Sequence, residues 1–339
     1  MDIHNSYFYN TPIKPKNIKN VGRVSEFREG ISISIESSSL LKKYPKPLIW
    51  VDADDLVISA FEKISSQNVL SAPVYCSIKK DWASILDIKD LCKFIVSLFD
   101  ENNKLKDIDY KGTTVRNILS HPDGTFIKPC PILSVKESIL SLLKFFHQGH
   151  HRVCISLDKH DKKQIAVVSE LNLVKWMDRH KSMLGETGEL NLEEIGMYTK
   201  DKTLISINCN SLAIDAFRIL AFNNIYGLPI VSDNGEIMDN ISVVDIKFTK
   251  FDLAKFMQPL SEFFIPNLAS KYPVPLRTPI ICTPQSRLRE VIGKITSCKV
   301  HRIFIADEQV DAGIVFAPKV VVSVSDIVRV ILIMCGIDR

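Results

Sequence analysis

The chain has 339 residues, of which 46% are hydrophobic and 24% are charged, as in an ordinary globular protein. Its formal net charge is +4, without the clustered basic excess of a nucleic-acid-binding surface, so we expect no nucleic-acid partner. The eight cysteines are scattered and form no CxxC pair, which excludes a disulfide scaffold and indicates free thiols in a reducing compartment.

The ends of the chain carry no predicted membrane or secretion signal. The N-terminal sequence lacks the apolar core of a signal peptide. Near the C-terminus, Asp326 and Arg329 interrupt the most apolar stretch, whereas a membrane span needs roughly 20 apolar residues. We therefore expect a soluble protein of the cytoplasm, and also of the nucleus, without contact with a membrane.

One pattern of elements (strand, helix, strand, strand, helix) is predicted four times in chain order. Each copy begins with a β-rich phrase, and its first helix has apolar residues at intervals of three and four, as Leu56, Ala60, Phe61 and Ile64 do in the first copy. The opening phrases lie at residues 47–54, 129–135, 203–210 and 278–284. The strands that follow the first helices are expected at residues 71–76, 151–157, 227–233 and 301–307.

A polar phrase begins the last helix of each copy, and its spacing indicates a duplicated pair. The phrases are Asp87–Asp90, Ser169–Asn172, Ser242–Asp245 and Ser323–Asp326. Asp90 and Asp245 are 155 residues apart, Asn172 and Asp326 are 154 apart, and His151 and His301 are 150 apart. Copies one and three therefore correspond, as do copies two and four.

The repeats define the expected domain boundaries. Residues 1–45 form a tail without a core-forming pattern, in which Ile31, Ile33 and Ile35 alternate with serines and predict a short edge strand. An insert at 309–319 is expected to form a loop. The predicted repeats span residues 46–105, 125–182, 201–255 and 274–337, and residues 183–200 are expected to be an exposed linker.

The repeated unit, with a small-x-Pro strand at 71–73 and 227–229, resembles the CBS (cystathionine-β-synthase) motif. Four units, with His-Arg pairs at 151–152 and 301–302 and an acid missing only from copy two, resemble the gamma subunit of AMP-activated protein kinase. The resemblance covers roughly residues 45–337. It implies an α/β (α+β) fold of four tandem β-α-β-β-α repeats, forming two pseudo-symmetric Bateman modules packed as a disc.

The resemblance also implies a function. It suggests a non-catalytic regulatory subunit that binds AMP, ADP or ATP as regulatory ligands at repeat interfaces, with the phosphates directed inwards, and that takes part in energy sensing. The implied partners are an alpha-type kinase catalytic subunit and a beta-type scaffolding subunit. The alternative is a CBS-repeat interaction or scaffold protein with degenerate sites or a different adenosyl ligand.

The candidate site residues have the chemistry that a nucleotide needs. A carboxylate can accept hydrogen bonds from both hydroxyls of a ribose, a helix N-terminus favours anions, and arginine grips phosphate in a bidentate manner with a histidine beside it. The candidate nucleotide-binding residues are Asp90, His151, Arg152, Ser242, Asp245, His301, Arg302, Ser323, Ser325 and Asp326. The alternatives are that the Ser-x-x-Asp phrases are only helix caps, that the arginines are surface residues and that His301 is a core histidine.

Two positions depart from the kinase-gamma pattern and predict weaker, fewer or different sites, because Leu70 and Leu171 stand where the family has basic residues. In copy two, Asn172 lacks the charged acceptor for a ribose, so we expect that site to be empty or weak. Asp87 beside Asp90 adds a negative charge that repels phosphate.

Other chemistries find little support in the sequence. The densest cluster of metal-ligand types, at 147–154, passes from a helix end into a strand, so we expect no metal. The sequence has no GxGxxG or P-loop motif. The four repeats occupy nearly the whole chain and leave no residues for a catalytic domain, so we expect that the protein is not an enzyme.

Overall fold

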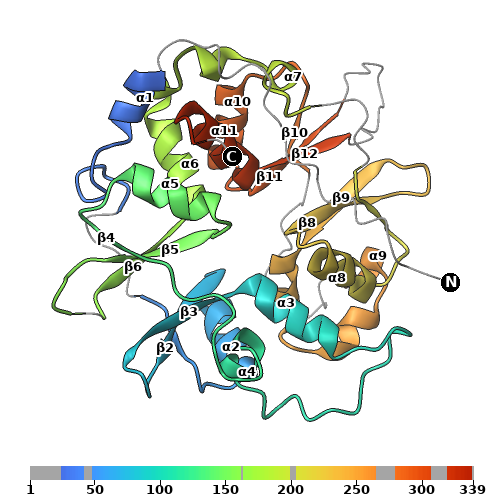
Figure 1. Ribbon diagram of the computed structural model, residues 1–339. Coiled ribbons are helices and arrows are strands. Elements are labelled where there is room, and N and C mark those ends of the chain that lie inside the picture. The colour runs from blue at the N-terminus through green and yellow to red at the C-terminus, as the bar shows by residue number, and fades with distance from the viewer. Residues whose placement is uncertain are drawn as a thin grey trace. The chain divides into compact units, whose positions relative to one another are not determined.

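A computed structural model describes residues 24–41, 48–161, 163–198, 204–264, 279–306 and 319–337 (Figure 1). Within these ranges lie four three-stranded sheets, and each pairs its first two strands in parallel and its last two antiparallel. The mixed α/β architecture of four repeats predicted from the sequence is confirmed. Apart from Lys319, the predicted insert at 309–319 lies outside the described residues.

The chain divides into two compact units that each combine two non-consecutive repeats. Unit 1 comprises residues 1–48, 131–204 and 280–339, and unit 2 comprises residues 49–130 and 205–279. Unit 1 therefore contains repeats two and four, and unit 2 contains repeats one and three. The predicted correspondence of alternate copies is thus matched by the way they pack.

Unit 2 contains two repeats with the same irregularity in the same place. Strands β2 and β3 change register between Val74 and Tyr75, and β8 and β9 change register between Ile230 and Val231. The elements of repeat one are β1 (Val51–Asp52), α2 (Val57–Ser66), β2 (Ser71–Cys76), β3 (Asp81–Asp87) and α3 (Ile88–Ser97), followed by α4 (Val115–Leu119). Those of repeat three are β7 (Ile207–Asn208), α8 (Ala213–Phe222), β8 (Gly227–Val231), β9 (Ile237–Ser242), η3 (Val243–Thr249), η4 (Leu253–Met257) and α9 (Leu260–Phe263).

The last helix of repeat three is a short 3₁₀ helix, unlike the α-helices of the other repeats. Helix η3 is rich in β-branched residues, which disfavour the α-helix, and it is followed by Lys250 and Phe251, both with positive φ.

Unit 1 contains repeats two and four together with flanking helices. The elements of repeat two are β4 (Ile132–Ser134), α5 (Ile139–His147), β5 (Arg152–Ser156), β6 (Ile165–Ser169) and α6 (Glu170–Arg179). Those of repeat four are β10 (Ile281–Cys282), α10 (Leu288–Ser297), β11 (Arg302–Ile305), β12 (Val320–Ser323) and α11 (Val324–Met334). The flanking helices are α1 (Val24–Gly30), η2 (Lys181–Glu189) and α7 (Leu192–Ile195).

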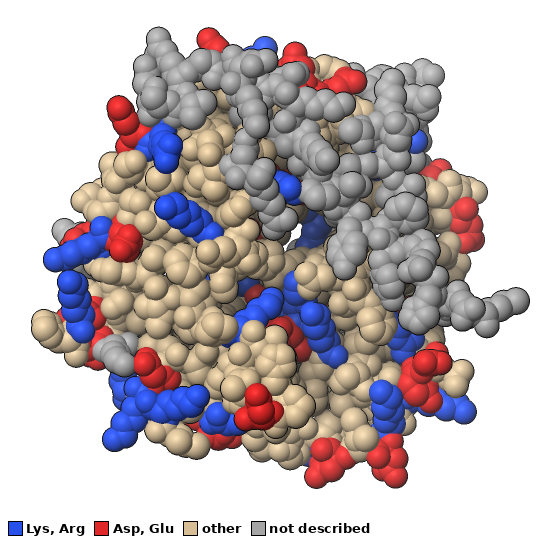
Figure 2. Space-filling view, in the orientation of Figure 1, with Lys and Arg blue, Asp and Glu red and all other residues tan. Residues whose placement is uncertain are grey.

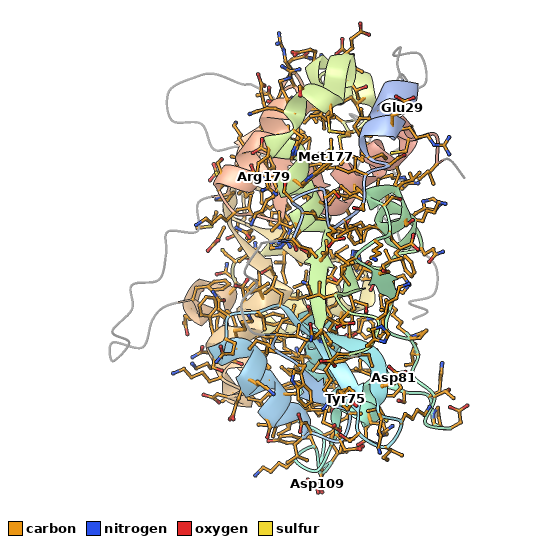
Figure 3. The ribbon with its side chains drawn as sticks, turned by 90° about the vertical axis from the view of Figure 1, so that its left-hand side faces the viewer. Glu29, Tyr75, Asp81, Asp109, Met177 and Arg179 are labelled. Atoms are coloured by element: carbon orange, nitrogen blue, oxygen red, sulfur yellow. The ribbon has the colours of Figure 1, made fainter. Side chains whose placement is uncertain are left out.

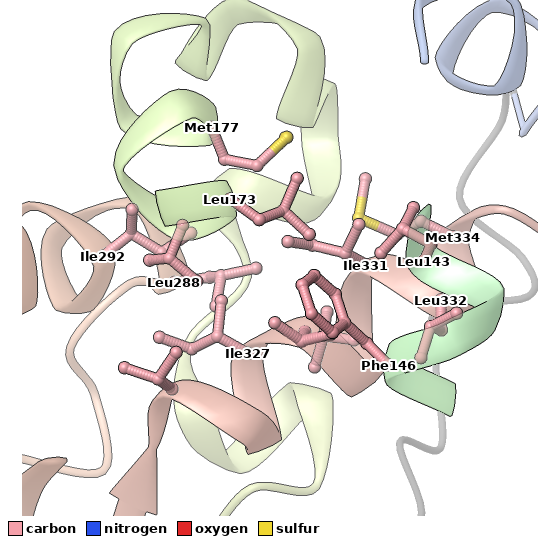
Figure 4. Packing of buried hydrophobic residues seen from close by; sticks show 14 of the residues in the cluster. Leu143, Phe146, Leu173, Met177, Leu288, Ile292, Ile327, Ile331, Leu332 and Met334 are labelled. Atoms are coloured by element: carbon pink, nitrogen blue, oxygen red, sulfur yellow. The ribbon is translucent and has the colours of Figure 1, made fainter. Parts of the chain in front are cut away.

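Helices from both repeats form the core of unit 1 (Figure 4). Leu173 and Met177 of α6 face Ile331 of α11, and the cluster is continued by Leu288 and Ile292 of α10. Helix α6 is amphipathic, since Met177 is buried whereas Arg179, two residues later, is exposed (Figure 3). These apolar faces bring the first turns of α6 and α11 into one unit.

Two sequence-based expectations for the segments around the repeats are wrong. The segment at 31–35, predicted as an edge strand, forms no regular strand: Ile31 and Ile35 are fully buried, and Ser34 forms an isolated antiparallel bridge with Ser138. The linker expected to be exposed at 183–200 contains most of η2 and all of α7, and it buries Leu184 and Leu192 in the core of unit 1. Both segments carry apolar residues three or four positions apart, which pack from a single helical face or turn. The repeat boundaries themselves stay predictions.

The surface carries charges of both signs. On the face shown in Figure 2, most acidic residues lie beside basic ones. Within the part of the chain that the structure describes, no helix has both the length and the apolarity to cross a membrane.

Candidate functional site

All four Ser-x-x-Asp-type phrases form capping boxes at the start of the last helices. In repeat four, Oδ2 of Asp326 accepts hydrogen bonds from the backbone N–H (2.8 Å) and the hydroxyl (2.7 Å) of Ser323. In repeat three, Oδ2 of Asp245 accepts the same two bonds from Ser242 at 2.7 and 3.1 Å. Asp87–Asp90 and Ser169–Asn172 make equivalent boxes. The cap interpretation is therefore confirmed, and contact with a ribose stays a prediction.

The three aspartates differ in their environment. Asp245 is only 2% exposed, whereas Asp326 is half-buried. Burial, reinforced by the charge of Asp87, raises the pKa of Asp90 to about 6. Of the three, Asp326 best combines an accessible carboxylate with a long α-helix behind it.

The two His-Arg pairs occupy equivalent places in unit 1. Arg152 is the first residue of β5 and lies opposite Ser169, and Arg302 is the first residue of β11 and lies opposite Ser323. The carbonyls of His151 and His301 accept hydrogen bonds from the first amides of α6 (3.2 Å) and α11 (3.0 Å). Each arginine therefore starts a strand opposite the N-cap of the last helix, and the preceding histidine accepts from the first amide of that helix.

One buried carboxylate joins candidate residues from repeats two and four. Glu170, the first residue of α6, is 8% exposed. Its Oε2 lies 3.0 Å from Nδ1 of His151 and accepts a 2.7 Å hydrogen bond from the Ser325 hydroxyl. Because an ionised carboxylate only accepts, Nδ1 is the protonated ring nitrogen in this arrangement.

Unit 2 places a buried cation near the corresponding position. Lys89, the second residue of α3, is 5% exposed, and its Nζ lies 4.4 Å from the ring centroid of Tyr226. Burial lowers the pKa of Lys89 to about 8, although Asp87 and Asp90 oppose the shift. Tyr226 takes the place that His151 and His301 have in unit 1, since its carbonyl accepts from the first amide of η3.

The predicted residues thus fall into two groups. Unit 2 holds Asp90, Ser242 and Asp245, and unit 1 holds His151, Arg152, His301, Arg302, Ser323, Ser325 and Asp326. Within unit 1, the buried Glu170 connects His151 to Ser325.

Sequence reasoning missed Glu170 and Lys89, although both lie inside the polar phrases that it singled out. A comparison of the first helical residue across the repeats would have found Glu170. The other three repeats bury Ile88, Val243 and Val324 there.

The histidines and the cysteine at 147–154 have different surroundings in the structure. His147 ends α5, Cys154 is buried within β5, and the ring of His150 packs 5.8 Å from that of Phe145. Among the residues that the structure describes, no group of three or more His, Cys, Asp or Glu side chains is placed to hold a metal ion.

The chain is similar to curated proteins of two names, a kinase gamma-subunit-like protein and SDS23. No known family profile matches it. An Arabidopsis thaliana protein named SNF1-related protein kinase regulatory subunit gamma-1-like is 29% identical over 214 residues, which cover 60% of this chain and 46% of that protein. Protein SDS23 of Kluyveromyces lactis is 24% identical over 291 residues, which cover 79% of this chain and 55% of that protein. The chain thus spans about half the length of these curated relatives.

A solved structure shares the fold. The structure of a putative archaeal homologue of g-AMPK from Methanocaldococcus jannaschii superposes with a TM-score of 0.63 at 13% identity. The match covers 84% of this chain and 96% of that one. The likeness shows a common fold over most of the chain.

Proposed function

We propose that this chain, a four-repeat CBS protein that resembles the gamma subunit of AMP-activated protein kinase, is a non-catalytic regulatory subunit of a protein kinase complex. It binds an adenosine-containing ligand at its repeats, with AMP, ADP and ATP as the first candidates. The observation that carries the proposal is the grouping of Ser323, Ser325 and Asp326 at the start of α11, with Arg302 directly opposite Ser323.

This grouping suits a nucleoside. The half-buried Asp326 carboxylate is a charged acceptor for two vicinal hydroxyls, and its bond to Ser323 holds it in one orientation. Helix α11 has 11 residues, and its first amides favour negative charge near its N-terminus. Arg302 starts the adjacent strand opposite Ser323, His301 precedes it, and both side chains are donors of the kind that phosphate takes.

Unit 2 offers a less favourable second site. Its Asp245 is almost fully buried, its last helix is short and of the 3₁₀ type, and the Asp90 carboxyl holds a proton more tightly than usual. We therefore propose that unit 1 fills first.

Regulation follows from differential binding. A ligand that contacts residues of repeats two and four favours the arrangement in which those residues converge, and it shifts the complex by its preference for that arrangement. The proposed partners are an alpha-type catalytic subunit and a beta-type scaffolding subunit, and the proposed location is the cytoplasm. Affinity purification from the native cell tests this part, and recovery without any kinase subunit would refute it.

Titration calorimetry tests the ligand site. Asp326→Ala should weaken binding of adenosine-containing ligands at least tenfold, because it removes a charge-assisted contact of about 1.5–3 kcal/mol. Asn172→Ala is the matched control, since it removes the same kind of cap from α6 without removing a predicted ribose contact. Equal affinities in wild type and Asp326→Ala would refute the site.

A scaffold without a physiological ligand is the second candidate. Leu171 near the start of α6, and the prior engagement of His151 and Ser325 by Glu170, favour it. In that case millimolar adenosine, AMP, ADP or ATP would leave the melting temperature unchanged, because a ligand specific for the folded state must raise it.

A further inference from the structure

Glu170 breaks the pattern of its position. In the other repeats, the first residue of the last helix is a buried aliphatic side chain: Ile88, Val243 or Val324. A buried carboxylate is costly to desolvate unless hydrogen bonds compensate it, and here His151 and Ser325 do so. The side chain of Glu170 is only 11% exposed, so solvent screens its charge weakly.

The groups that hold Glu170 are the ones expected to hold a ligand's phosphate. The Ser325 hydroxyl directs its proton to the Glu170 carboxylate at 2.7 Å, and Nδ1 of His151 is engaged at 3.0 Å. Arg152, His301 and Arg302 also each have an interaction within the protein. A phosphate entering beside Ser325 would therefore meet donors already in use and a negative charge at close range.

We propose that Glu170 is a specificity-determining residue that serves as the built-in anion of the unit 1 site, so that this site selects an adenosyl ligand with an uncharged or cationic 5′ group over a nucleotide. The inference rests on the proposed function, because it concerns the ligand held by Asp326. The carboxylate engages two of the donors that a phosphate would need, Ser325 and His151, and places a negative charge beside them. A neutral or cationic 5′ group leaves these bonds intact.

The test compares adenosine with AMP by titration calorimetry on the full chain, and loss of binding in Asp326→Ala assigns the site. We expect the wild type to bind adenosine at least as tightly as AMP. Glu170→Gln should shift the ratio of the two dissociation constants towards AMP by about tenfold or more, since it removes the charge and keeps the shape. Because a buried substitution can impair folding, Glu170→Val provides a second variant with the residue that repeats three and four carry there.

Glu29→Gln is the control for net charge, since Glu29 is an exposed residue of α1 in the same unit (Figure 3). It should leave the ratio unchanged. A wild-type preference for AMP, or an unchanged ratio in folded Glu170→Gln and Glu170→Val, would overturn the inference and leave the proposed function standing. Failure of both adenosine and AMP to bind the wild type, with ADP and ATP also inert, would overturn the proposed function as well.

Discussion

The two compact units begin their last helices with buried charges of opposite sign. In unit 1, Glu170 at the start of α6 is held by a histidine and a hydroxyl. In unit 2, Lys89 in the first turn of α3 lies against the face of Tyr226. The positive end of the helix dipole stabilises the carboxylate of Glu170 and destabilises the ammonium group of Lys89. The two units therefore bury ionisable groups at equivalent places, but the helix favours the charge in only one of them.

The contrast shows which parts of the repeat are fixed by packing and which are free to diverge. One turn into the helix, both units have a fully buried leucine: Leu91 of α3 in unit 2 and Leu173 of α6 in unit 1. The polar positions around them are set by local partners. The buried apolar positions therefore specify the fold, and the polar residues of the first helical turn specify which charged groups each unit presents.

The cores differ as well. In unit 1 the cluster in Figure 4 is mostly aliphatic, whereas in unit 2 Phe217 makes edge-to-face contacts with Phe256 and Phe263 at 5.2 and 5.7 Å.

Truncation of a large core residue in either unit should give the largest loss of stability. We expect Trp176→Ala in unit 1 and Phe217→Ala in unit 2 each to lower the free energy of unfolding by about 3–5 kcal/mol, because both side chains are fully buried. Trp176 also donates its indole N–H to the Ser38 carbonyl at 2.6 Å, which Trp176→Ala leaves without that donor. Urea denaturation measures both effects.

Tryptophan fluorescence can assign each loss to a unit. Trp176 belongs to unit 1, whereas Trp50 and Trp82 belong to unit 2. With Trp50 and Trp82 replaced by phenylalanine, the remaining fluorescence comes from Trp176 and reports the unfolding of unit 1. Phe217→Ala should therefore lower the midpoint of the unfolding transition seen by circular dichroism more than the midpoint seen by this fluorescence. Coincident shifts would show that the units unfold together and would break the distinction.

The next largest effect should be a pH dependence confined to unit 2. The folded-state pKa of Asp90 is about 6 against an ordinary value of 3.8, so between these values the folded chain retains a proton that the unfolded chain has released. Stability should therefore fall as the pH rises from about 4 to about 6, by roughly 2–3 kcal/mol at most. Asp90→Asn should flatten this slope in urea titrations monitored through Trp50 and Trp82.

Asn172 occupies the equivalent position of repeat two and carries no ionisable group. An unchanged slope in Asp90→Asn would contradict the assignment.

Lys89 should change the stability of the chain at higher pH. Its folded-state pKa of about 8 lies below 10.5, so stability should rise between these values as the unfolded chain loses its extra proton.

Surface ion pairs should give the smallest difference. Arg116 of unit 2 binds both carboxylate oxygens of Asp54, at 2.8 and 3.1 Å, whereas Arg287 of unit 1 makes a single 2.8 Å bond to the exposed Glu189. Arg116→Ala should cost about 1 kcal/mol and Arg287→Ala about 0.5 kcal/mol or less, measured by thermal unfolding at low salt. Added salt should reduce both losses, and a larger loss for Arg287→Ala would reverse the ranking.

Much of the fold could be predicted from spacing alone. The phrases that end at Asp90, Asn172, Asp245 and Asp326 identified four helix starts, because a capping box depends on residues only three positions apart. Alternation predicted a strand at Ile31 and Ile35, but their four-residue separation also suits a turn with both side chains buried on one side.

The site was harder to predict than the fold. In repeats two and four, each His-Arg pair lies at the same end as a helix cap, because strand pairing within a repeat is local. The convergence of His151, Glu170 and Ser325 depends on the packing of α6 against α11, whose sequences lie about 150 residues apart. No local pattern reports such a contact.

The interleaved order of the two units has a consequence for biosynthesis. The chain passes between the units near residues 48, 130, 204 and 279. While the ribosome is still translating the second repeat, the first repeat lacks the partner with which it shares a core, and unit 1 is completed only when α11 emerges. The apolar surfaces of the repeats that are synthesised first therefore stay unburied until the later repeats emerge. Under such conditions folding is slow and nascent chains depend on chaperones.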